Sequence, residues 1–394
     1  MGKRLFLNGN YAVAYGVKLA RAQVVAAYPI TPQTKIVEQI SEFISNGEMD
    51  AEFVKVESEH TAMTACYTAS CAGARVFTAT SSQGLLYMYE MMQFTSGARR
   101  PVVMANANRA ISAPWTIWLD HQDCMSTRDA GWMQIHVESA QEALDTTIQC
   151  FKVAENQDIL TPVMVCLDAF VLSHTDEVVE LPEQSAIDAF LPPFRLADAV
   201  DVNHPITVSA GMAPNLYMEM RYLQEQAIQK AKDEWNKADA EYGRLVGRSY
   251  GGVVENYQCA DADAVLVTMG SLSSTAKEVV DNLRAQGHKV GLAKIRLYRP
   301  FPQKELCETL KGARAIGVID RSNSFGFEGP LFSDVKAALY NNRINPPAVN
   351  YIAGLGGRDV TADDLDKIYR QLLDIGNTGQ GNQAVEYIGL RWYE

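Results

Sequence analysis

The sequence lacks any apolar run close to the roughly 20 residues that a membrane-spanning helix requires. Its first residues, Gly2-Lys3-Arg4, precede only three apolar or aromatic residues. That segment is too short for the apolar core of a signal peptide. We therefore expect a soluble, cytoplasmic protein with no membrane span.

Closely spaced cysteines are also missing. The chain has seven cysteines, an odd number, and no Cys-x-x-Cys, so it lacks the spacing of a disulfide framework or a zinc site. An iron–sulfur cluster needs four thiolates, and no segment offers such a set. The sequence predicts reduced thiols and no metal site on this chain. If electrons leave the protein through iron–sulfur clusters, another chain holds them. The cysteines are Cys66, Cys71, Cys124, Cys150, Cys166, Cys259 and Cys307.

Basic residues are outnumbered, with 35 Lys and Arg against 47 Asp and Glu and a net charge of −12. A nucleic-acid backbone would be repelled by this charge, so we expect no DNA or RNA partner. The chain also has no Gly-x-Gly-x-x-Gly and no Gly-x-x-x-x-Gly-Lys-Ser/Thr. Nucleotide binding is therefore unsupported.

The sequence does contain an alternation of short β-rich runs and helical patterns. With 394 residues, 47 % of them hydrophobic, the chain is long enough for about two or three domains. We predict an α/β domain with a parallel sheet over residues 1–190, a connector with a long polar helix over 191–255, and a second α/β domain over 256–394. In the first domain, ligands are expected beyond the carboxyl ends of the strands.

Two candidate segments follow the first strands. Tyr28-Pro29-Ile30-Thr31-Pro32 comes after the strand predicted at 24–28 and could bind a ligand, but Thr31 as N-cap with Pro32 at N1 would explain it equally well. Glu59 precedes an Ala-rich helix predicted at 61–69. It could cap the helix or favour the helix dipole, or it could face the pyrimidine nitrogen N1′ of thiamine diphosphate.

Two further segments follow later strands. Ser81-Ser82-Gln83-Gly84 could close the sheet or admit a ligand before a helix predicted at 85–94. Arg109 follows a buried strand and could bind a substrate carboxylate bidentately. A structural ion pair with Asp120 or Asp123 is the alternative. A metal bound by His121 and the nearby carboxylates is discounted, because their spacing is not that of a ligand set.

Taken together, these segments closely resemble the α subunit of pyruvate:ferredoxin oxidoreductase and related 2-oxoacid:acceptor oxidoreductases. The order and spacing match, and the resemblance covers nearly the whole chain. It is carried by Tyr-Pro-Ile-Thr-Pro at 28–32, Ser-Glu at 58–59, Ser-Gln-Gly at 82–84, Asn-Arg-Ala at 108–110, Asp-His-Gln-Asp at 120–123, Arg-Asp-x-Gly-Trp at 128–132 and Lys-Ile-Arg-x-x-Arg-Pro-Phe-Pro at 294–302.

The resemblance implies a thiamine-diphosphate-binding pyrimidine domain and a transketolase C-terminal-like domain. A β subunit would hold the diphosphate and Mg²⁺, and β and δ-type subunits would hold the [4Fe-4S] clusters. A γ-type subunit would belong to the same complex, and ferredoxin or another acceptor and coenzyme A would be further reactants. No Gly-Asp-Gly followed by Asn-Asn, the usual diphosphate motif, occurs in this chain. By resemblance Glu59 activates the aminopyrimidine, Thr31 donates to the substrate and Arg109 binds its carboxylate. Tyr28, Pro29, Ser82, Gln83 and Gly84 would line the cofactor, and Trp115 and Asp120 the substrate.

The 2-oxoacid itself stays open. Thr31 suits a pyruvate-like ligand, whereas Trp115 departs from the smaller aliphatic residue of pyruvate-type members. Trp115 could stack on an aromatic substrate such as phenylglyoxylate or pack in the core. A lipoamide-linked 2-oxoacid dehydrogenase component and a non-catalytic scaffold are the rival functions.

Overall fold

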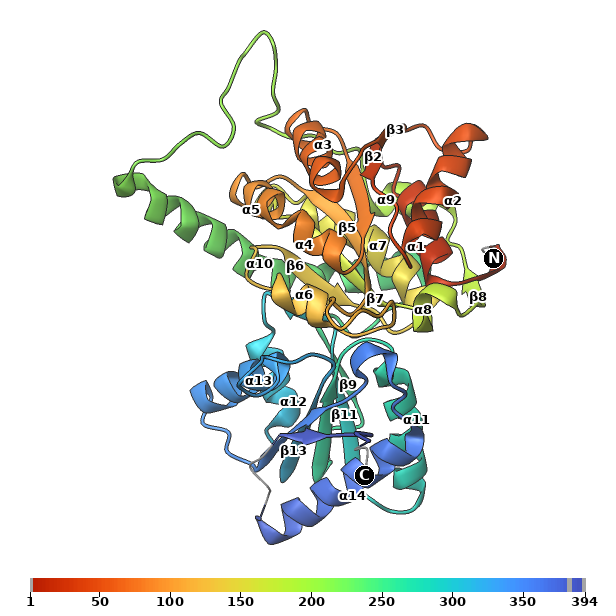
Figure 1. Ribbon diagram of the computed structural model, residues 1–394, viewed down its shortest axis with the longest axis vertical. Coiled ribbons are helices and arrows are strands. Elements are labelled where there is room, and N and C mark those ends of the chain that lie inside the picture. The colour runs from red at the N-terminus through yellow and green to blue at the C-terminus, as the bar shows by residue number, and fades with distance from the viewer. Residues whose placement is uncertain (1–2, 381–384, 392–394) are drawn as a thin grey trace.

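The protein is described from a computed structural model, which places residues 3–380 and 385–391 and has two α/β units stacked end to end (Figure 1). The predicted α/β fold class is confirmed. In the described residues, no helix combines the length and the apolar character needed to cross a membrane.

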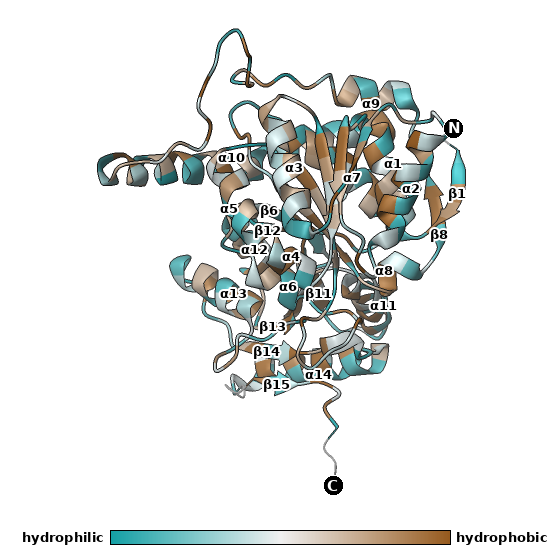
Figure 2. Cartoon of the chain, turned by 45° about the horizontal axis from the view of Figure 1, so that its top comes forward, coloured by the Kyte–Doolittle hydropathy of each residue, from teal (hydrophilic) through white to brown (hydrophobic). Residues whose placement is uncertain are grey.

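The first unit is built on a seven-stranded sheet with the order β12-β6-β7-β5-β4-β2-β3, parallel except for β12. Every residue of β4, β5 and β7 is buried, so helices cover both faces of the central strands, which are hydrophobic (Figure 2). The strands are β2 (Val24–Ala27), β3 (Glu52–Lys55), β4 (Val76–Thr80), β5 (Val102–Asn108), β6 (Met133–His136), β7 (Val163–Asp168) and β12 (Leu297–Arg299).

Nine helices and a two-stranded antiparallel ribbon surround this sheet in the described residues. The predicted single helix at 85–94 is wrong: two helices meet at Met88. The helices are α1 (Gly9–Leu19), α2 (Thr34–Ser45), α3 (Glu59–Cys71), α4 (Gln83–Tyr87), α5 (Tyr89–Gly97), α6 (Gln122–Ser126), α7 (Ala140–Ala154), α8 (Val171–His174) and α9 (Gln184–Phe190), and the ribbon is β1 (Arg4–Leu7) with β8 (Glu177–Glu180).

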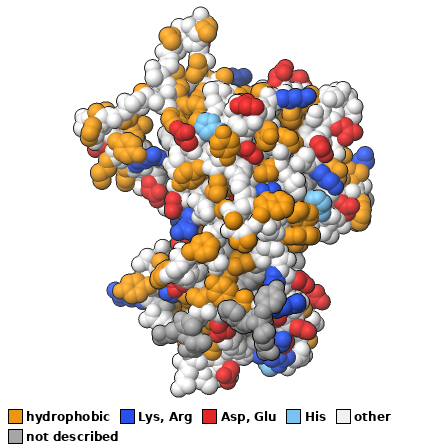
Figure 3. Space-filling model, viewed as in Figure 1, with side chains coloured by type: hydrophobic (Ala, Val, Ile, Leu, Met, Phe, Trp, Pro, Cys, Tyr) orange, Lys and Arg blue, Asp and Glu red, His pale blue; other side chains and the backbone are white. Residues whose placement is uncertain are grey.

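The long polar helix of the connector is α10 (Pro214–Val246). Its first turns project from the body and carry exposed hydrophobic side chains (Figures 1 and 3). From Gln224 onward one face is buried, including Trp235 and Tyr242, and Tyr242 donates to Asp145 of α7 at 2.6 Å. The second half of α10 therefore packs firmly on the first unit.

The second unit is built on a six-stranded sheet with the order β15-β14-β13-β10-β11-β9, in which β9 is antiparallel to β11. The chain leaves β11 directly into β12, which pairs with β6 and so joins the sheet of the first unit. Its elements are β9 (Val254–Tyr257), β10 (Ala264–Thr268), α11 (Leu272–Ala285), β11 (Val290–Ile295), α12 (Gln303–Leu310), β13 (Ala315–Asp320), α13 (Pro330–Asn341), β14 (Ala348–Ile352), a 3₁₀ turn (Leu355–Gly357), α14 (Ala362–Thr378) and β15 (Glu386–Tyr387).

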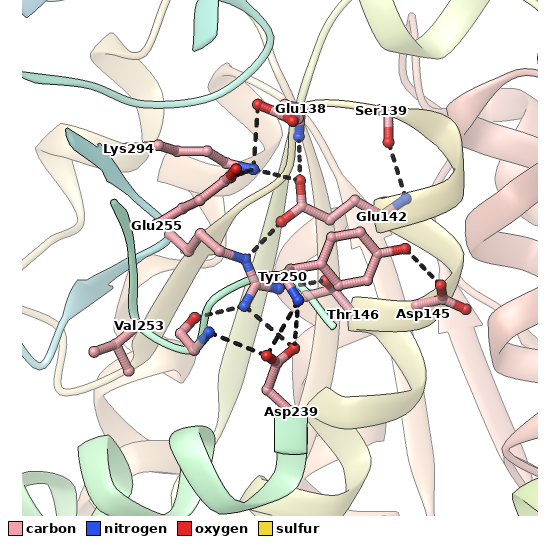
Figure 4. Close-up of polar contacts among 12 residues, drawn as sticks. Glu138, Ser139, Glu142, Asp145, Thr146, Asp239, Tyr250, Val253, Glu255 and Lys294 are labelled. Carbon is pink, nitrogen blue, oxygen red and sulfur yellow. Dashed lines mark hydrogen bonds and ion pairs between the residues drawn. The ribbon is translucent and has the colours of Figure 1, made fainter. Parts of the chain in front are cut away.

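A buried ion network joins the two units (Figure 4). Glu142 of α7 accepts hydrogen bonds from Lys294 Nζ at 2.8 Å and from Arg296 Nε at 2.6 Å. All three side chains are fully buried. Burial alone would raise the pKa of Glu142, but the two cations lower it to about 2. The network therefore holds β11 against α7 with Glu142 ionised.

Candidate functional site

Three loops meet at the carboxyl ends of β2, β4 and β5. Arg109, in the loop after β5, contacts the other two loops. Its guanidinium donates to the Thr31 carbonyl oxygen at 2.7 Å and to Gln83 Oε1 at 2.8 Å. These contacts bring together three residues predicted from the sequence. They form because parallel strands end at the same edge of a sheet.

Arg109 is 6 % exposed and forms no ion pair within 4.0 Å in the described part of the chain. The alternative of an ion pair with Asp120 or Asp123 is therefore wrong. Burial lowers the pKa of Arg109, an effect that the charges of Asp123 and Glu59 partly offset. Its Nε has no hydrogen-bond partner. A buried cation without a carboxylate partner is costly, and an anionic ligand would relieve that cost.

Asp123 has a structural role that the sequence did not reveal. Its carboxylate is fully buried and accepts from the backbone nitrogens of Ser82 and Arg109, each at 3.1 Å. It also accepts from Asn106 Nδ2 at 3.0 Å and Asn108 Nδ2 at 2.9 Å. Asp123 thus fixes the loop of Ser82 relative to the loop of Arg109. A second acid in the Asp-His-Gln-Asp motif was the only sequence signal for it.

Glu59 is the first residue of α3, and Ser58 caps that helix by accepting from the Thr61 backbone nitrogen at 3.2 Å. Glu59 is therefore not needed as a cap. Its side chain is 8 % exposed and packs against Gly84: a Cβ on Gly84 would lie 2.6 Å from both Glu59 Oε1 and Thr80 Oγ1. Only glycine leaves room for this carboxylate.

Thr31 does not cap α2, so the capping alternative is wrong. The helix begins at Thr34, and Gln33 precedes it without a side-chain cap. Instead, Gln33 Nε2 donates to the Tyr28 carbonyl oxygen at 2.9 Å and Asn10 Nδ2 donates to the Pro32 carbonyl oxygen at 2.8 Å. The loop is thus held through its backbone, and the Thr31 hydroxyl is not used for capping.

A groove of about 720 Å³ lies next to this loop. Tyr28 and Pro29 line it, together with Phe53 and Val56, so it is largely apolar. Glu59 and Arg109 are not part of its lining. The groove therefore accounts for two of the predicted cofactor residues but not for the polar cluster.

Ser82 adopts a left-handed backbone conformation, with φ of +50°. Its Oγ lies 2.6 Å from both the Ala110 carbonyl oxygen and Gln83 Oε1. Gln83 Nε2 and Thr80 Oγ1 are buried without a hydrogen-bond partner. The strained turn thus aims Gln83 at Arg109, and it leaves two buried polar atoms unpartnered, of which Thr80 Oγ1 lies beside Gly84 as Glu59 does. A ligand can satisfy such atoms.

The two remaining predicted residues lie on the loop that follows Arg109. Trp115 is 74 % exposed, so the alternative that it packs in the core is wrong. The Asp120 carboxylate accepts from the Gln122 and Gly356 backbone nitrogens at 3.0 and 3.4 Å. Burial raises the pKa of Asp120 to about 6. Asp120 therefore holds the loop against the second unit, and within the described residues its carboxylate makes no hydrogen bond to Arg109.

Comparison with known proteins identifies the family. A family model described as pyruvate flavodoxin/ferredoxin oxidoreductase, thiamine diphosphate-binding, matches residues 15–240, and core domain II of pyruvate:ferredoxin oxidoreductase matches 262–365. The ketoisovalerate oxidoreductase subunit VorA of Pyrococcus abyssi is 48 % identical over 98 % of this chain and 97 % of the relative. The pyruvate synthase subunit PorA of Methanosarcina barkeri is 46 % identical over 96 % and 94 %.

A solved structure shares the fold. The 2-oxoglutarate:ferredoxin oxidoreductase of Magnetococcus marinus, with 2-oxoglutarate, coenzyme A and succinyl-CoA bound, superposes with a TM-score of 0.73 at 18 % identity. The match covers 94 % of this chain and 66 % of that one. The resemblance seen in the sequence is confirmed, and the chain belongs to the pyruvate flavodoxin/ferredoxin oxidoreductase family.

Proposed function

We propose that this chain holds the pyrimidine end of thiamine diphosphate and the substrate carboxylate in a 2-oxoacid:ferredoxin oxidoreductase. The reaction is the coenzyme A-dependent oxidative decarboxylation of a small aliphatic 2-oxoacid to an acyl-CoA and carbon dioxide. The observation that carries the proposal is the buried Arg109 guanidinium, which has no carboxylate partner in the described residues and shares one strand-end cluster with Glu59 and Gly84.

The residues present fit the pyrimidine of thiamine diphosphate. Glu59 is a buried carboxylate with a fixed position against Gly84, and Gln83 Nε2 and Thr80 Oγ1 lack partners. When bound, the cofactor supplies an electron sink for decarboxylation. Glu59 would hold a hydrogen bond to the pyrimidine N1′, and Tyr28, Pro29 and Ser82 would complete its surroundings.

Arg109 would bind the substrate carboxylate. Its contacts with the Thr31 carbonyl oxygen and Gln83 use two of its nitrogens and fix the plane of the guanidinium. Because the carboxylate leaves as carbon dioxide, Arg109 stabilises the bound substrate more than the transition state. The Thr31 hydroxyl would donate to the same substrate.

Other subunits would complete the enzyme. The relatives are named as subunits, and this sequence lacks the usual diphosphate motif. We assign the diphosphate and Mg²⁺ to a β-type subunit and the [4Fe-4S] clusters to partner subunits that pass electrons to ferredoxin. The cytoplasmic location also stays a proposal, supported by seven buried free cysteines, which are typical of a reducing compartment.

The experiment is purification of the chain with the subunits that assemble with it, followed by assays with pyruvate, 2-oxobutyrate, 2-oxoisovalerate and phenylglyoxylate, each with coenzyme A and a viologen dye. We expect activity with the aliphatic acids, in line with relatives named for pyruvate and ketoisovalerate. Preference for phenylglyoxylate would favour the aromatic alternative, for which the exposed Trp115 is the supporting observation.

The same preparation separates the rival functions. Cluster absorbance that bleaches when substrate is added distinguishes this enzyme from a lipoamide-linked dehydrogenase component. Full activity of the complex with Glu59→Ala would show that the chain is a non-catalytic scaffold and would overturn the proposal.

A further inference from the structure

Three side chains that are distant in the sequence meet in the core behind the candidate site. Cys124 lies on α6, His136 ends β6 and Cys166 lies on β7. One ligand atom from each, two sulfurs and a ring nitrogen, lies within 4.8 Å of the others. Each residue is 1 % exposed or less. The spacing in the sequence gave no sign of this cluster, because three different elements bring the residues together.

Several polar atoms around this cluster have no partner. Both ring nitrogens of His136 are buried without a hydrogen bond, and so is Oδ1 of Asn106. In the sheet, Cys166 is paired with His136 on one side and with Asn106 on the other, so the three side chains share one face. An unpartnered buried polar group costs about 1–3 kcal/mol. Three possible metal ligands therefore lie close together, with an unpartnered amide oxygen on the same face of the sheet, where a purely structural core would use apolar side chains.

We propose that Cys124, His136 and Cys166 bind one zinc ion. Thiolate sulfur and imidazole nitrogen are the ligands that zinc prefers, and two Cys with one His is a known set that leaves the fourth position to water. A water in that position would donate to the unpartnered Asn106 oxygen.

The geometry and the charge both suit zinc. Ligand atoms about 2.0–2.3 Å from a tetrahedral ion are about 3.5–3.8 Å apart. Since the three atoms lie within 4.8 Å of one another, they need to approach by at most about 1.0–1.3 Å, within the range of side-chain rotation. The two thiols release their protons to solvent on binding, and two thiolates with Zn²⁺ and a neutral imidazole carry no net charge.

The ion would also affect the candidate site. α6 has only five residues, too few to be stable alone. Cys124 is next to Asp123, whose carboxylate accepts hydrogen bonds from the backbone nitrogens of Ser82 and Arg109. Zinc bound through Cys124 would tie α6 to the sheet and so hold Asp123 in place. The zinc site does not depend on the proposed function.

The test uses the full chain, stripped of metal with a chelator under reducing, anoxic conditions and then reloaded with Zn²⁺ or Co²⁺. We expect one tightly bound zinc per chain, a thermal midpoint that rises on zinc addition, and a thiolate-to-cobalt charge-transfer absorption. Cys124→Ser and His136→Gln should lose all three signals. Cys150→Ser is the matched control, since Cys150 is equally buried but lies outside the cluster.

Two results would overturn the zinc site. One is a folded wild-type chain that retains less than about a tenth of an equivalent of zinc and shows no cobalt–thiolate absorption. The other is loss of zinc in Cys150→Ser as large as in Cys124→Ser. If the two ligand variants fail to fold, the cobalt spectrum of the wild-type chain still shows whether thiolates bind the metal.

Discussion

Gly84 and Glu59 are packed so closely that a single methyl group on Gly84 would lie 2.6 Å from the Glu59 carboxylate oxygen. We expect Gly84→Ala to displace Glu59 and to lower turnover at least tenfold, while the free energy of unfolding falls by only about 1–3 kcal/mol, as for other overpacked sites. Steady-state kinetics and urea denaturation measure the two effects.

Gly312→Ala is the matched control, because nothing lies within 4 Å of a Cβ at Gly312. Both its turnover and its stability should stay close to those of the wild type. A Gly84→Ala variant with full turnover would mean that the position of Glu59 does not matter for the reaction.

Glu59 and Arg109 are predicted to affect different kinetic constants. Glu59→Gln should lower turnover by about 100-fold or more, which is the effect expected when a group that takes part in general acid–base catalysis is lost. Arg109→Lys should chiefly raise the Michaelis constant, by about tenfold, because lysine cannot reproduce the planar guanidinium contact with a carboxylate. The measurement is initial rate against 2-oxoacid concentration for each variant.

Glu57→Gln serves as the control for Glu59→Gln. Glu57 is two residues away but exposed, and its carboxylate accepts from the Thr61 hydroxyl. The Glu57→Gln variant should keep the wild-type turnover rate. An equal loss through the Michaelis constant alone in both Glu59→Gln and Arg109→Lys would contradict the assigned roles.

Much of the fold could be predicted from the sequence. Strands 76–80, 290–295 and 315–320 can be recognised from the sequence, because a buried parallel strand is a short apolar run between turn residues. Met133–His136 and Leu297–Arg299 were not predicted. They are short and partly polar, and their pairing with each other is set by contacts between the two units.

The candidate site was predictable only in outline. The ends of parallel strands had to meet, so Thr31, Gln83 and Arg109 could be expected together. The sequence could not show that the Arg109 backbone, and not its guanidinium, contacts Asp123. Such buried hydrogen bonds depend on loop conformations, among them the positive φ of Ser82, which no local pattern specifies.

Trp115 and Trp132 should differ sharply in their effect on stability. Trp115 is 74 % exposed, so Trp115→Ala should change the free energy of unfolding by no more than about 0.5 kcal/mol. Trp132 is fully buried and donates from Nε1 to the Met92 carbonyl oxygen at 2.9 Å. Trp132→Ala should cost about 3–5 kcal/mol. Urea denaturation of both variants tests this contrast.

The same Trp115→Ala variant tests the substrate. For an enzyme of aliphatic 2-oxoacids, the Michaelis constant for pyruvate should be unchanged, and phenylglyoxylate should be a poor substrate before and after the substitution. A selective loss of phenylglyoxylate activity would favour the aromatic alternative.

Glu142 is expected to be critical for joining the two units. Glu142→Gln leaves the buried cations Lys294 and Arg296 without their shared carboxylate, and breaking a buried pair in this way costs about 3–5 kcal/mol. Asp366→Asn removes an ion pair with Arg370 that is largely exposed and should cost less than about 1 kcal/mol. Similar denaturation midpoints for the two variants would contradict a joining role for Glu142.

The stabilisation from Glu142 should depend on pH in a defined direction. Its pKa is lowered to about 2 in the folded chain, against about 4.3 when unfolded. The unfolded state therefore binds more protons between these values, and the free energy of unfolding falls as the pH falls through this window. Glu142→Gln has no carboxyl group to titrate, so the stability difference between wild type and variant should be largest above about pH 5 and should shrink towards pH 2. Urea denaturation at a series of pH values measures that difference. A difference that stays constant or grows on acidification would mean that Glu142 is not held ionised by its two cations.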